Sequence, residues 1–288
     1  MSDPPGATGR TPPVALTIAG SDSGAGAGIQ ADLKAMSALG VFATTVVTAI
    51  TAQNTAEVTA VHPVPTAVVD AQLSAVLDDF PVVAVKTGML AVTATVRLVA
   101  DRAAAGNLPS LVVDPVMVAS TGKRLLDDEA VDAYRHRLVP CALVVTPNLF
   151  EAAILAGVEP VGHADVDSMV DLARRIHDLG PDWVLVKGGH LPGVHTAGPG
   201  PAPDRVTDVL FDGTDAWVLD ATRVDTRNNH GTGCSLASAI AAMLARGADV
   251  QTAVAGARQF VHEALTGAAG WDLGRGHGPL DPFGWSSR

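Results

Sequence analysis

Cysteine and aromatic residues are scarce in this sequence of 288 residues. Its only cysteines, Cys141 and Cys234, lie far apart and form no CxxC pattern, so neither a disulfide framework nor a zinc finger is indicated. This cysteine usage favours a reducing cytoplasm. Basic residues are also few, with 19 Lys and Arg against 30 Asp and Glu. The resulting net charge of −11 offers no general attraction for nucleic acid or anionic lipid, so neither is an expected partner.

A long hydrophobic run is missing as well. The longest uncharged stretch, residues 35–56, is interrupted by Gly40 and ends in polar residues, so no membrane span is expected. Residues 1–13 contain no apolar segment and predict a disordered tail rather than a signal peptide. The full sequence is 48% hydrophobic, which rules out a disordered or fibrous class. We expect residues 14–288 to form a single domain.

Short apolar runs alternate with helical patterns along the chain. Buried strands are predicted at 14–20, 41–50, 82–86, 111–114, 143–148 and 183–187. Apolar residues at helical spacing over 29–36 and 69–80 predict amphipathic helices between them. This alternation predicts an α/β fold with a mainly parallel central sheet and helices on both faces. Residues 191–205, rich in Gly, Pro and Ala, predict a flexible loop that could cover a site, and a hairpin is expected around Asp212-Gly213.

Several predicted strands end in polar residues. These are Lys86, Asp114, Thr146 with Asn148, and Lys187. Ligands of open α/β sheets bind outside the carboxyl ends of the strands, so these groups are expected to converge on one crevice. The alternative is that strand ends are simply wet, an interpretation that applies most readily to Lys86 taken alone.

The most informative segment is the glycine-rich turn at 229–235, which is followed by apolar residues at helical spacing. Such a turn presents unpaired backbone N–H groups and the positive end of the helix dipole, so it predicts a phosphate site. Cys234 would lie in the first turn, where the pKa of a thiol tends to fall, and a thiolate there could accept a proton. The alternative is a small buried cysteine in a packing helix.

Other nucleotide motifs do not fit. The glycine run at 20–29 fails the G-x-G-x-x-G pattern because Ile29 stands where the third glycine is required. Around Gly122-Lys123 the Walker A pattern lacks its earlier glycine, since position 117 is Met117. Because the G-x-G-x-x-G pattern of dinucleotide sites fails, a nicotinamide-dependent oxidoreductase is disfavoured. Neither G-x-S-x-G nor H-E-x-x-H occurs.

The order of several motifs carries a family resemblance from about residue 14 to 283. The motifs are LTIAGSDSGAGAGIQADLK, TAITAQNT, VKTGML, VVDPVM, TPNLFEA, WVLVKGGH, NNHGTGCSLASAIAA and LGRGHGPLDPF. With them the sequence resembles the hydroxymethylpyrimidine/phosphomethylpyrimidine kinases of thiamine biosynthesis, members of the ribokinase-like superfamily. The resemblance implies a ribokinase-like fold, a homodimer, and ATP and Mg²⁺ as cofactors. It also implies phosphorylation of 4-amino-5-hydroxymethyl-2-methylpyrimidine, then of its monophosphate to the pyrophosphate.

The same resemblance implies roles for the phosphate-side residues. Gly231 and Gly233 would form an oxyanion cradle, and Cys234 would be the catalytic base. Other residues would contact ATP or its phosphates, namely Lys187, Asn148, Asp114 and Thr232. Glu151, together with Asp114, would lie near Mg²⁺.

On the substrate side, the resemblance implies that Gln53 binds the aminopyrimidine. The pocket around it would be lined by Gly20, Asp22, Met89 and Val116. One departure is visible, since the run often written SGGGAG in the family is SGAGAG here. If position 25 needs a positive φ, Ala25 would strain this loop.

Two further functions stay open from the sequence. A pyridoxal or pyridoxine kinase of the same fold would act on a similar hydroxymethyl group on a six-membered nitrogen ring. A non-catalytic phosphopyrimidine-binding protein would keep the crevice without turnover. Substrate-dependent ATP consumption distinguishes a kinase from such a binder.

Overall fold

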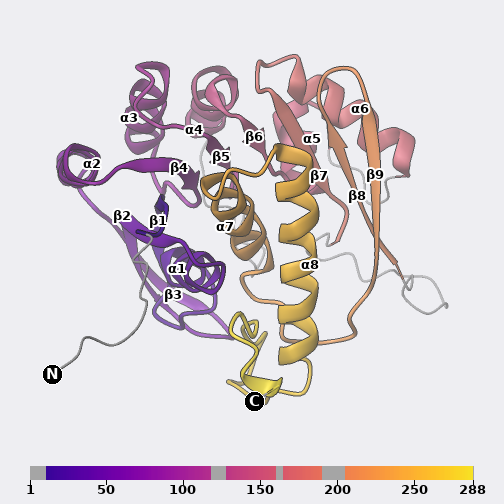
Figure 1. Cartoon of the computed structure of the whole chain (residues 1–288). Coiled ribbons are helices and arrows are strands. Elements are labelled where there is room, and N and C mark those ends of the chain that lie inside the picture. The colour runs from indigo at the N-terminus through magenta and orange to yellow at the C-terminus, as the bar shows by residue number, and fades with distance from the viewer. Residues whose placement is uncertain (1–10, 118–127, 160–164, 190–204, 288) are drawn as a thin grey trace, which may run out of the picture.

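A nine-stranded sheet with helices packed on it forms the body of the molecule (Figure 1). The structure is a computed structural model that describes residues 11–117, 128–159, 165–189 and 205–287. Its strands are β1 (Val14–Ser21), β2 (Phe42–Gln53), β3 (Val58–Pro63), β4 (Val82–Thr87), β5 (Leu111–Val113), β6 (Val144–Val145), β7 (Trp183–Lys187), β8 (Arg205–Phe211) and β9 (Ala216–Thr222). Its α-helices are α1 (Gly28–Ala38), α2 (Thr66–Asp79), α3 (Thr93–Ala104), α4 (Asp128–Ala133), α5 (Leu149–Ala156), α6 (Val166–His177), α7 (Thr232–Ala245) and α8 (Val250–Ala268).

The strand order is β3-β2-β1-β4-β5-β6-β7-β8-β9. The six strands β1, β2, β4, β5, β6 and β7 pair in parallel, whereas β3, β8 and β9 are antiparallel additions at the two edges. The prediction of a mainly parallel α/β sheet is therefore confirmed. The six strands expected in the interior are all present, and the hairpin expected around Asp212-Gly213 is β8–β9.

Alternate residues of the central strands pack into two separate cores, one on each face of the sheet. Leu16, Ile18 and Val85 point into the core shared with α2 to α6. Ala15 and Ala84 point into the other core, which contains side chains of α1, α7 and α8. On this second face α7 and α8 pack side by side (Figure 1). Because α7 is rich in buried alanines, it approaches the sheet closely and brings its N-terminus to the strand ends.

Two predictions about mobile segments fall largely outside the described residues. Residues 1–10 of the expected tail and 191–204 of the expected loop lie there. The predicted loop extends one residue too far, since Arg205 already belongs to β8. Strand β3 was not expected, because its side chains are mostly exposed and carry no alternating apolar signal.

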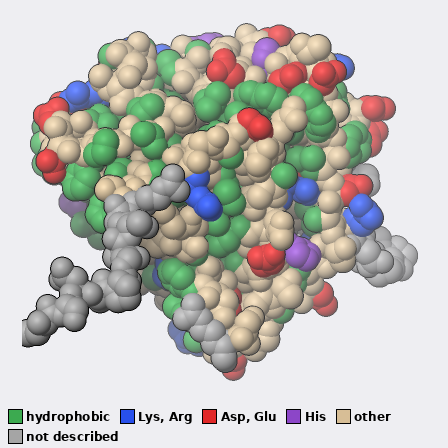
Figure 2. All heavy atoms as spheres, viewed as in Figure 1, with side chains coloured by type: hydrophobic (Ala, Val, Ile, Leu, Met, Phe, Trp, Pro, Cys, Tyr) green, Lys and Arg blue, Asp and Glu red, His purple; other side chains and the backbone are tan. Residues whose placement is uncertain are grey.

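Across the described ranges, no helix combines the length and apolar character needed to cross a membrane. On the face drawn in Figure 2, Lys and Arg side chains stand in separate places among hydrophobic and uncharged ones.

Candidate active site

Two loops from opposite ends of the sequence meet at the N-terminus of α7. Gly231 precedes the helix with φ at +83°, and a Cβ at this position would overlap the carbonyl oxygen of Gly26 in the β1–α1 loop. Only glycine allows both this backbone conformation and this contact. Gly231 also has no side chain to cap the helix. The Thr232 N–H donates to the Asn229 carbonyl at 3.3 Å, so the first turn leaves the N–H groups of Gly233 and Cys234 as donors for an anion.

The ends of β5 and β7 bring a charged pair to the same turn. Lys187 Nζ donates to Asp114 Oδ1 at 2.9 Å, and a Cβ on Gly233 would lie 3.3 Å from that Nζ. Burial lowers the pKa of Lys187, but the neighbouring carboxylates of Asp114 and Glu151 outweigh it and raise the pKa above its ordinary value. Lys187 is therefore a cation beside the helix N-terminus, and the predicted convergence of these strand ends is confirmed.

Asn148 immediately precedes α5 and Glu151 lies in its first turn, and the two residues form a capping box. The Asn148 side chain accepts from the Glu151 N–H, and the Glu151 carboxylate accepts from the Asn148 N–H, both at 2.9 Å. Burial raises the pKa of Glu151 to about 7; Lys187 opposes this shift and Asp114 adds to it. The capping box thus fixes a buried carboxyl group next to the Lys187–Asp114 pair.

These carboxylates bear on the expected Mg²⁺. Within the described part of the chain, no group of three His, Cys, Asp or Glu side chains is arranged to hold a metal by itself. Mg²⁺ in phosphoryl-transfer sites is instead held by one or two carboxylates together with substrate phosphates and waters. Asp114 and Glu151 supply such hard oxygen donors near an anion site, so the residues present fit this kind of binding.

Cys234 lies in the first turn of α7 and is partly exposed, whereas the helix from Ser235 to Ala242 is buried. The Gly28 N–H donates a hydrogen bond to the Cys234 sulfur. Burial raises the pKa of the thiol to about 11, although Lys86 lowers it, while Asp32 and Asp114 raise it further. The expectation of a depressed pKa is therefore wrong, because burial of the sulfur and the carboxylates of Asp32 and Asp114 raise the pKa more than Lys86 and the Gly28 N–H lower it. In this state the thiol is protonated at neutral pH.

Lys86 is fully buried, so the alternative of a solvent-exposed residue at a strand end is wrong. Its Nζ lies 2.9 Å from both oxygens of Asp32, whose carboxylate also accepts from the hydroxyls of Thr17 and Ser238. Burial lowers the pKa of Lys86, but Asp32, then Cys234 and Asp114, raise it above the ordinary value. Because Ser238 follows Cys234 by one helical turn, this ion pair lies on the face of α7 that carries the sulfur.

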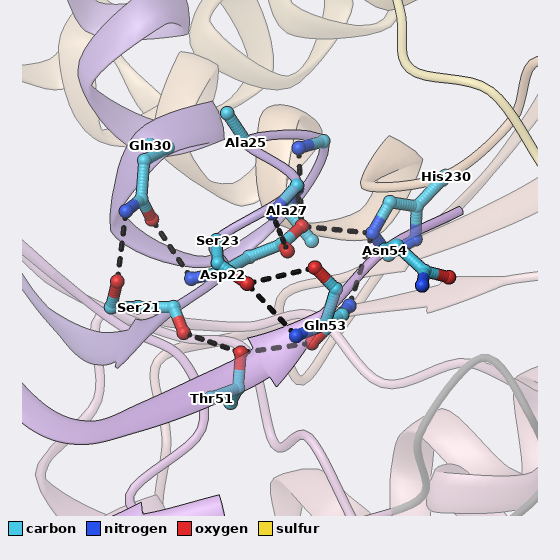
Figure 3. Close-up of polar contacts among 12 residues, drawn as sticks. Ser21, Asp22, Ser23, Ala25, Ala27, Gln30, Thr51, Gln53, Asn54 and His230 are labelled. Carbon is cyan, nitrogen blue, oxygen red and sulfur yellow. Dashed lines mark hydrogen bonds and ion pairs between the residues drawn. The ribbon is translucent and has the colours of Figure 1, made fainter. Parts of the chain in front are cut away.

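On the substrate side, Asp22 organises the β1–α1 loop (Figure 3). Its carboxylate accepts from the N–H groups of Gly24 at 2.8 Å, Gly26 at 3.1 Å and Ala27 at 2.8 Å. His230 Nε2 lies 3.0 Å from Oδ2 of the same carboxylate. Burial alone would raise the pKa of Asp22, but His230 and the backbone donors hold it below the ordinary value. Asp22 is therefore ionised and joins the loop to the turn before α7.

The other expected pocket residues divide between two places. Gln53 ends β2, and its side chain lies beside His230 at 3.2 Å. Gly20 and Met89 touch, since a Cβ on Gly20 would overlap the Met89 methyl group. Val116 instead follows Asp114, and its N–H donates to the Asp114 carbonyl at 2.9 Å. Gly20, Asp22, Gln53 and Met89 thus flank the β1–α1 loop, with Val116 on the phosphate side.

Ala25, where this sequence departs from the family's glycine run, has the positive φ that strains a residue with a side chain. Its φ is +58°, and its N–H donates to the Asp22 carbonyl at 2.9 Å. A side chain in the left-handed region costs about 1 kcal/mol or more. Ala25 therefore strains a loop whose position its hydrogen bonds nevertheless fix.

Residue patterns indicated only part of this arrangement. His230 belongs to the glycine-rich turn at 229–235, but its contact with Asp22 spans 208 positions of sequence, which no local pattern reports. Asp32 and Ser238 gave no signal, because each sits singly within a helix.

A protein-family model gives the decisive comparison. The model for phosphomethylpyrimidine kinase matches residues 22–281, which includes both loops and every strand after β1. The chain belongs to the phosphomethylpyrimidine kinase family. The hydroxymethylpyrimidine/phosphomethylpyrimidine kinase of Rhizobium meliloti is 48% identical over 270 residues, covering 94% of this chain and 97% of the relative.

Solved structures extend this comparison to a second kind of kinase. The pyridoxal kinase of Bacillus subtilis, solved as an ADP complex, is 36% identical with a TM-score of 0.83, covering 96% of this chain and all of that one. The phosphomethylpyrimidine kinase of Clostridium difficile is 38% identical with a TM-score of 0.74, covering 88% of this chain and 99% of that one. This phosphomethylpyrimidine kinase family member therefore has the ribokinase-like fold that its motifs predicted.

Proposed function

We propose that this kinase transfers the γ-phosphoryl group of ATP to the hydroxymethyl group of 4-amino-5-hydroxymethyl-2-methylpyrimidine, and a second phosphoryl group to the resulting monophosphate. The observation that carries the proposal is the junction at α7, where the turn at Gly231, the Lys187–Asp114 pair and the Cys234 sulfur meet. A helix N-terminus with an adjacent cation suits a transferring phosphoryl group. The family membership supports the choice of substrate.

On the phosphate side, the protein aligns the reactants and neutralises charge, which accounts for most of the catalysis of phosphoryl transfer. In this proposal the backbone N–H groups of Gly231 and Gly233 bind the phosphoryl oxygens. Thr232, whose own N–H donates to the Asn229 carbonyl, contacts the phosphates of ATP. Lys187 neutralises charge on the nucleotide phosphates, and Asn148 contacts ATP near those phosphates. Asp114 and Glu151 would hold Mg²⁺, which when bound neutralises phosphate charge. The ADP complex of the Bacillus subtilis neighbour supports a nucleotide in this fold.

Cys234 is the proposed base that takes the proton of the acceptor hydroxymethyl group. Because burial raises the pKa of its thiol to about 11, the thiolate is a minor form at neutral pH. Its fraction rises tenfold for each pH unit below that value. The rate of a reaction that needs this thiolate therefore increases with pH through the neutral and mildly alkaline range.

On the substrate side, Gln53 is the proposed reader of the aminopyrimidine, because an amide donates and accepts at once. The pocket around it is assigned to Gly20, Asp22, Met89 and Val116. Loss of the Gln53 amide is expected to leave polar groups of the ring unpaired.

The test is ADP formation and product identity with Cys234→Ala. We expect its transfer rate to fall by about 10² to 10⁴ while substrate binding survives. The matched control is Cys141→Ala, which removes the other thiol, at a distance from α7, and is expected to keep the rate. An unchanged rate in Cys234→Ala would rule out the base role.

Pyridoxal is the second candidate substrate, because the Bacillus subtilis neighbour is a pyridoxal kinase with a TM-score of 0.83. Competition between the two substrates, measured as the ratio of kcat/KM, decides between them. ATP consumption that stays zero with either substrate, despite ligand binding, would instead favour a non-catalytic binder.

A single domain over residues 14–288, a homodimer and a cytoplasmic location complete the proposal. The continuous nine-stranded sheet supports the first. Exposed Phe42 and Ile50 on β2 support an apolar contact with a second copy. Light scattering of the purified chain measures the molar mass that tests the dimer.

A further inference from the structure

His230 lies between two groups that make opposite demands on one atom (Figure 3). Its Nε2 is 3.0 Å from Asp22 Oδ2 and 3.2 Å from Gln53 Nε2. An ionised carboxylate only accepts hydrogen bonds, and an amide nitrogen only donates them. A ring nitrogen that donates to Asp22 cannot accept from Gln53, so both contacts cannot be hydrogen bonds with the amide nitrogen facing the histidine.

The surroundings of Asp22 decide where the imidazole proton lies. Asp22 Oδ2 already accepts from the backbone N–H groups of Gly26 and Ala27, so it is an acceptor in a cluster of donors. A lone pair of Nε2 at 3.0 Å from this oxygen would be repelled by it. Nε2 therefore carries a proton and donates it to Asp22.

Thr51 gives the same answer from the other end of the amide. Its Oγ1 lies 2.8 Å from the carbonyl oxygen of Ser21 and 3.3 Å from Gln53 Oε1. The single hydroxyl proton is committed to Ser21, because a carbonyl only accepts. Thr51 Oγ1 can then only accept from Gln53, which requires the amide nitrogen on that side.

Both ends are satisfied when the Gln53 amide is turned by half a revolution about its last side-chain bond. We propose that His230 is a positioning residue that holds the Gln53 amide with its oxygen toward His230 and its nitrogen toward Thr51. His230 Nε2–H then donates a bifurcated hydrogen bond to Asp22 and to the amide oxygen, and the amide nitrogen donates to Thr51. Heavy-atom positions stay as they are, and no donor faces a donor.

This orientation gives His230 a part in substrate choice, an extension that rests on the proposed function. One N–H and one lone pair of the Gln53 amide remain available, in a fixed order. An aminopyrimidine offers the complementary pair, a ring nitrogen that accepts and an exocyclic amine that donates. Pyridoxal carries an aldehyde, which only accepts, at the ring position where the aminopyrimidine carries its amine, so the fixed amide oxygen finds no donor at that position. His230 thereby favours the aminopyrimidine over pyridoxal.

The kinetic test compares His230→Leu, which removes the donor, with His230→Gln, whose amide N–H is placed like Nε2–H. His230→Leu is expected to raise KM for the aminopyrimidine about 10- to 100-fold with a smaller change in kcat, and to lower the preference over pyridoxal by a similar factor. His230→Gln is expected to recover most of that preference. The control is His62→Leu, an exposed histidine on β3. A preference that is unchanged in His230→Leu, or that His230→Gln does not recover, would overturn the proposal.

A second measurement does not depend on activity. ¹⁵N NMR of the full chain at about pH 8.5, above the ordinary titration range of histidine, is expected to show His230 with its proton on Nε2. A proton on Nδ1 would overturn the positioning role whatever the enzyme phosphorylates. Wild-type protein that transfers no phosphoryl group to either substrate would refute the proposed function alone.

Discussion

The buried ion pair beneath Cys234 gives the sharpest prediction about stability. Lys86 and Asp32 have side chains that are 0% exposed, and Asp32 also accepts from the hydroxyls of Thr17 and Ser238. In Lys86→Met a side chain of similar length fills the space, so the change is mainly the loss of the cation. The carboxylate is then left in a dry interior with two hydroxyl donors.

The size of the effect follows from that residue environment. Removing one partner of a buried ion pair costs about 3 to 5 kcal/mol. The hydroxyls of Thr17 and Ser238 still bond the carboxylate, which places Lys86→Met near the lower end, about 3 kcal/mol. In Lys86→Met with Asp32→Asn no charge remains buried, and the Asn oxygen still accepts one hydroxyl. The double variant is therefore expected to be more stable than Lys86→Met, by about 2 kcal/mol.

Urea unfolding near neutral pH measures these free energies. The matched control is Arg97→Met, which breaks the ion pair with Glu129, whose two side chains are 48% and 63% exposed. An exposed pair contributes about 0 to 1 kcal/mol, so the control is expected to unfold almost as the wild type does. A Lys86→Met variant that is also within about 1 kcal/mol of wild type would refute the reasoning.

Three further predictions concern the two loops. Ala25→Gly removes the side chain that makes the positive φ costly. The variant is expected to raise Tm by about 2 to 4 °C in calorimetry, corresponding to about 1 kcal/mol. Gly231→Ala puts a methyl group against Gly26 and is expected to cost more than about 2 kcal/mol and to weaken ADP binding in titration calorimetry. In a Cys141→Ser background, Cys234 is expected to react with iodoacetamide at about pH 8 some 100-fold more slowly than an ordinary cysteine, because burial raises its pKa to about 11 from 9.0.

Each outcome has a clear opposite. A lower Tm in Ala25→Gly would mean that the loop is not strained at this position. Unaltered ADP binding in Gly231→Ala would separate the turn from the phosphates. Fast alkylation of Cys234 at neutral pH would show that the thiol is not shifted upward, since thiolate is the reactive form.

The sequence by itself determined the layered sheet and the positions of most candidate residues. Periodicity reports which side chains face a core, so the strands at 14–20, 82–86 and 183–187 were predictable from local pattern. The glycine-rich turn before α7 was also predictable from local sequence, because it depends on neighbours within a few residues.

Only the tertiary structure decided the electrostatics of the site. The Asp22–His230 contact joins residues 208 positions apart, and Lys86 meets Asp32 across 54. The upward pKa of Cys234 arises from burial among distant segments, which a helix-start pattern does not encode. Local pattern fixes where a side chain begins, but desolvation and charge depend on what the folded chain packs around its end.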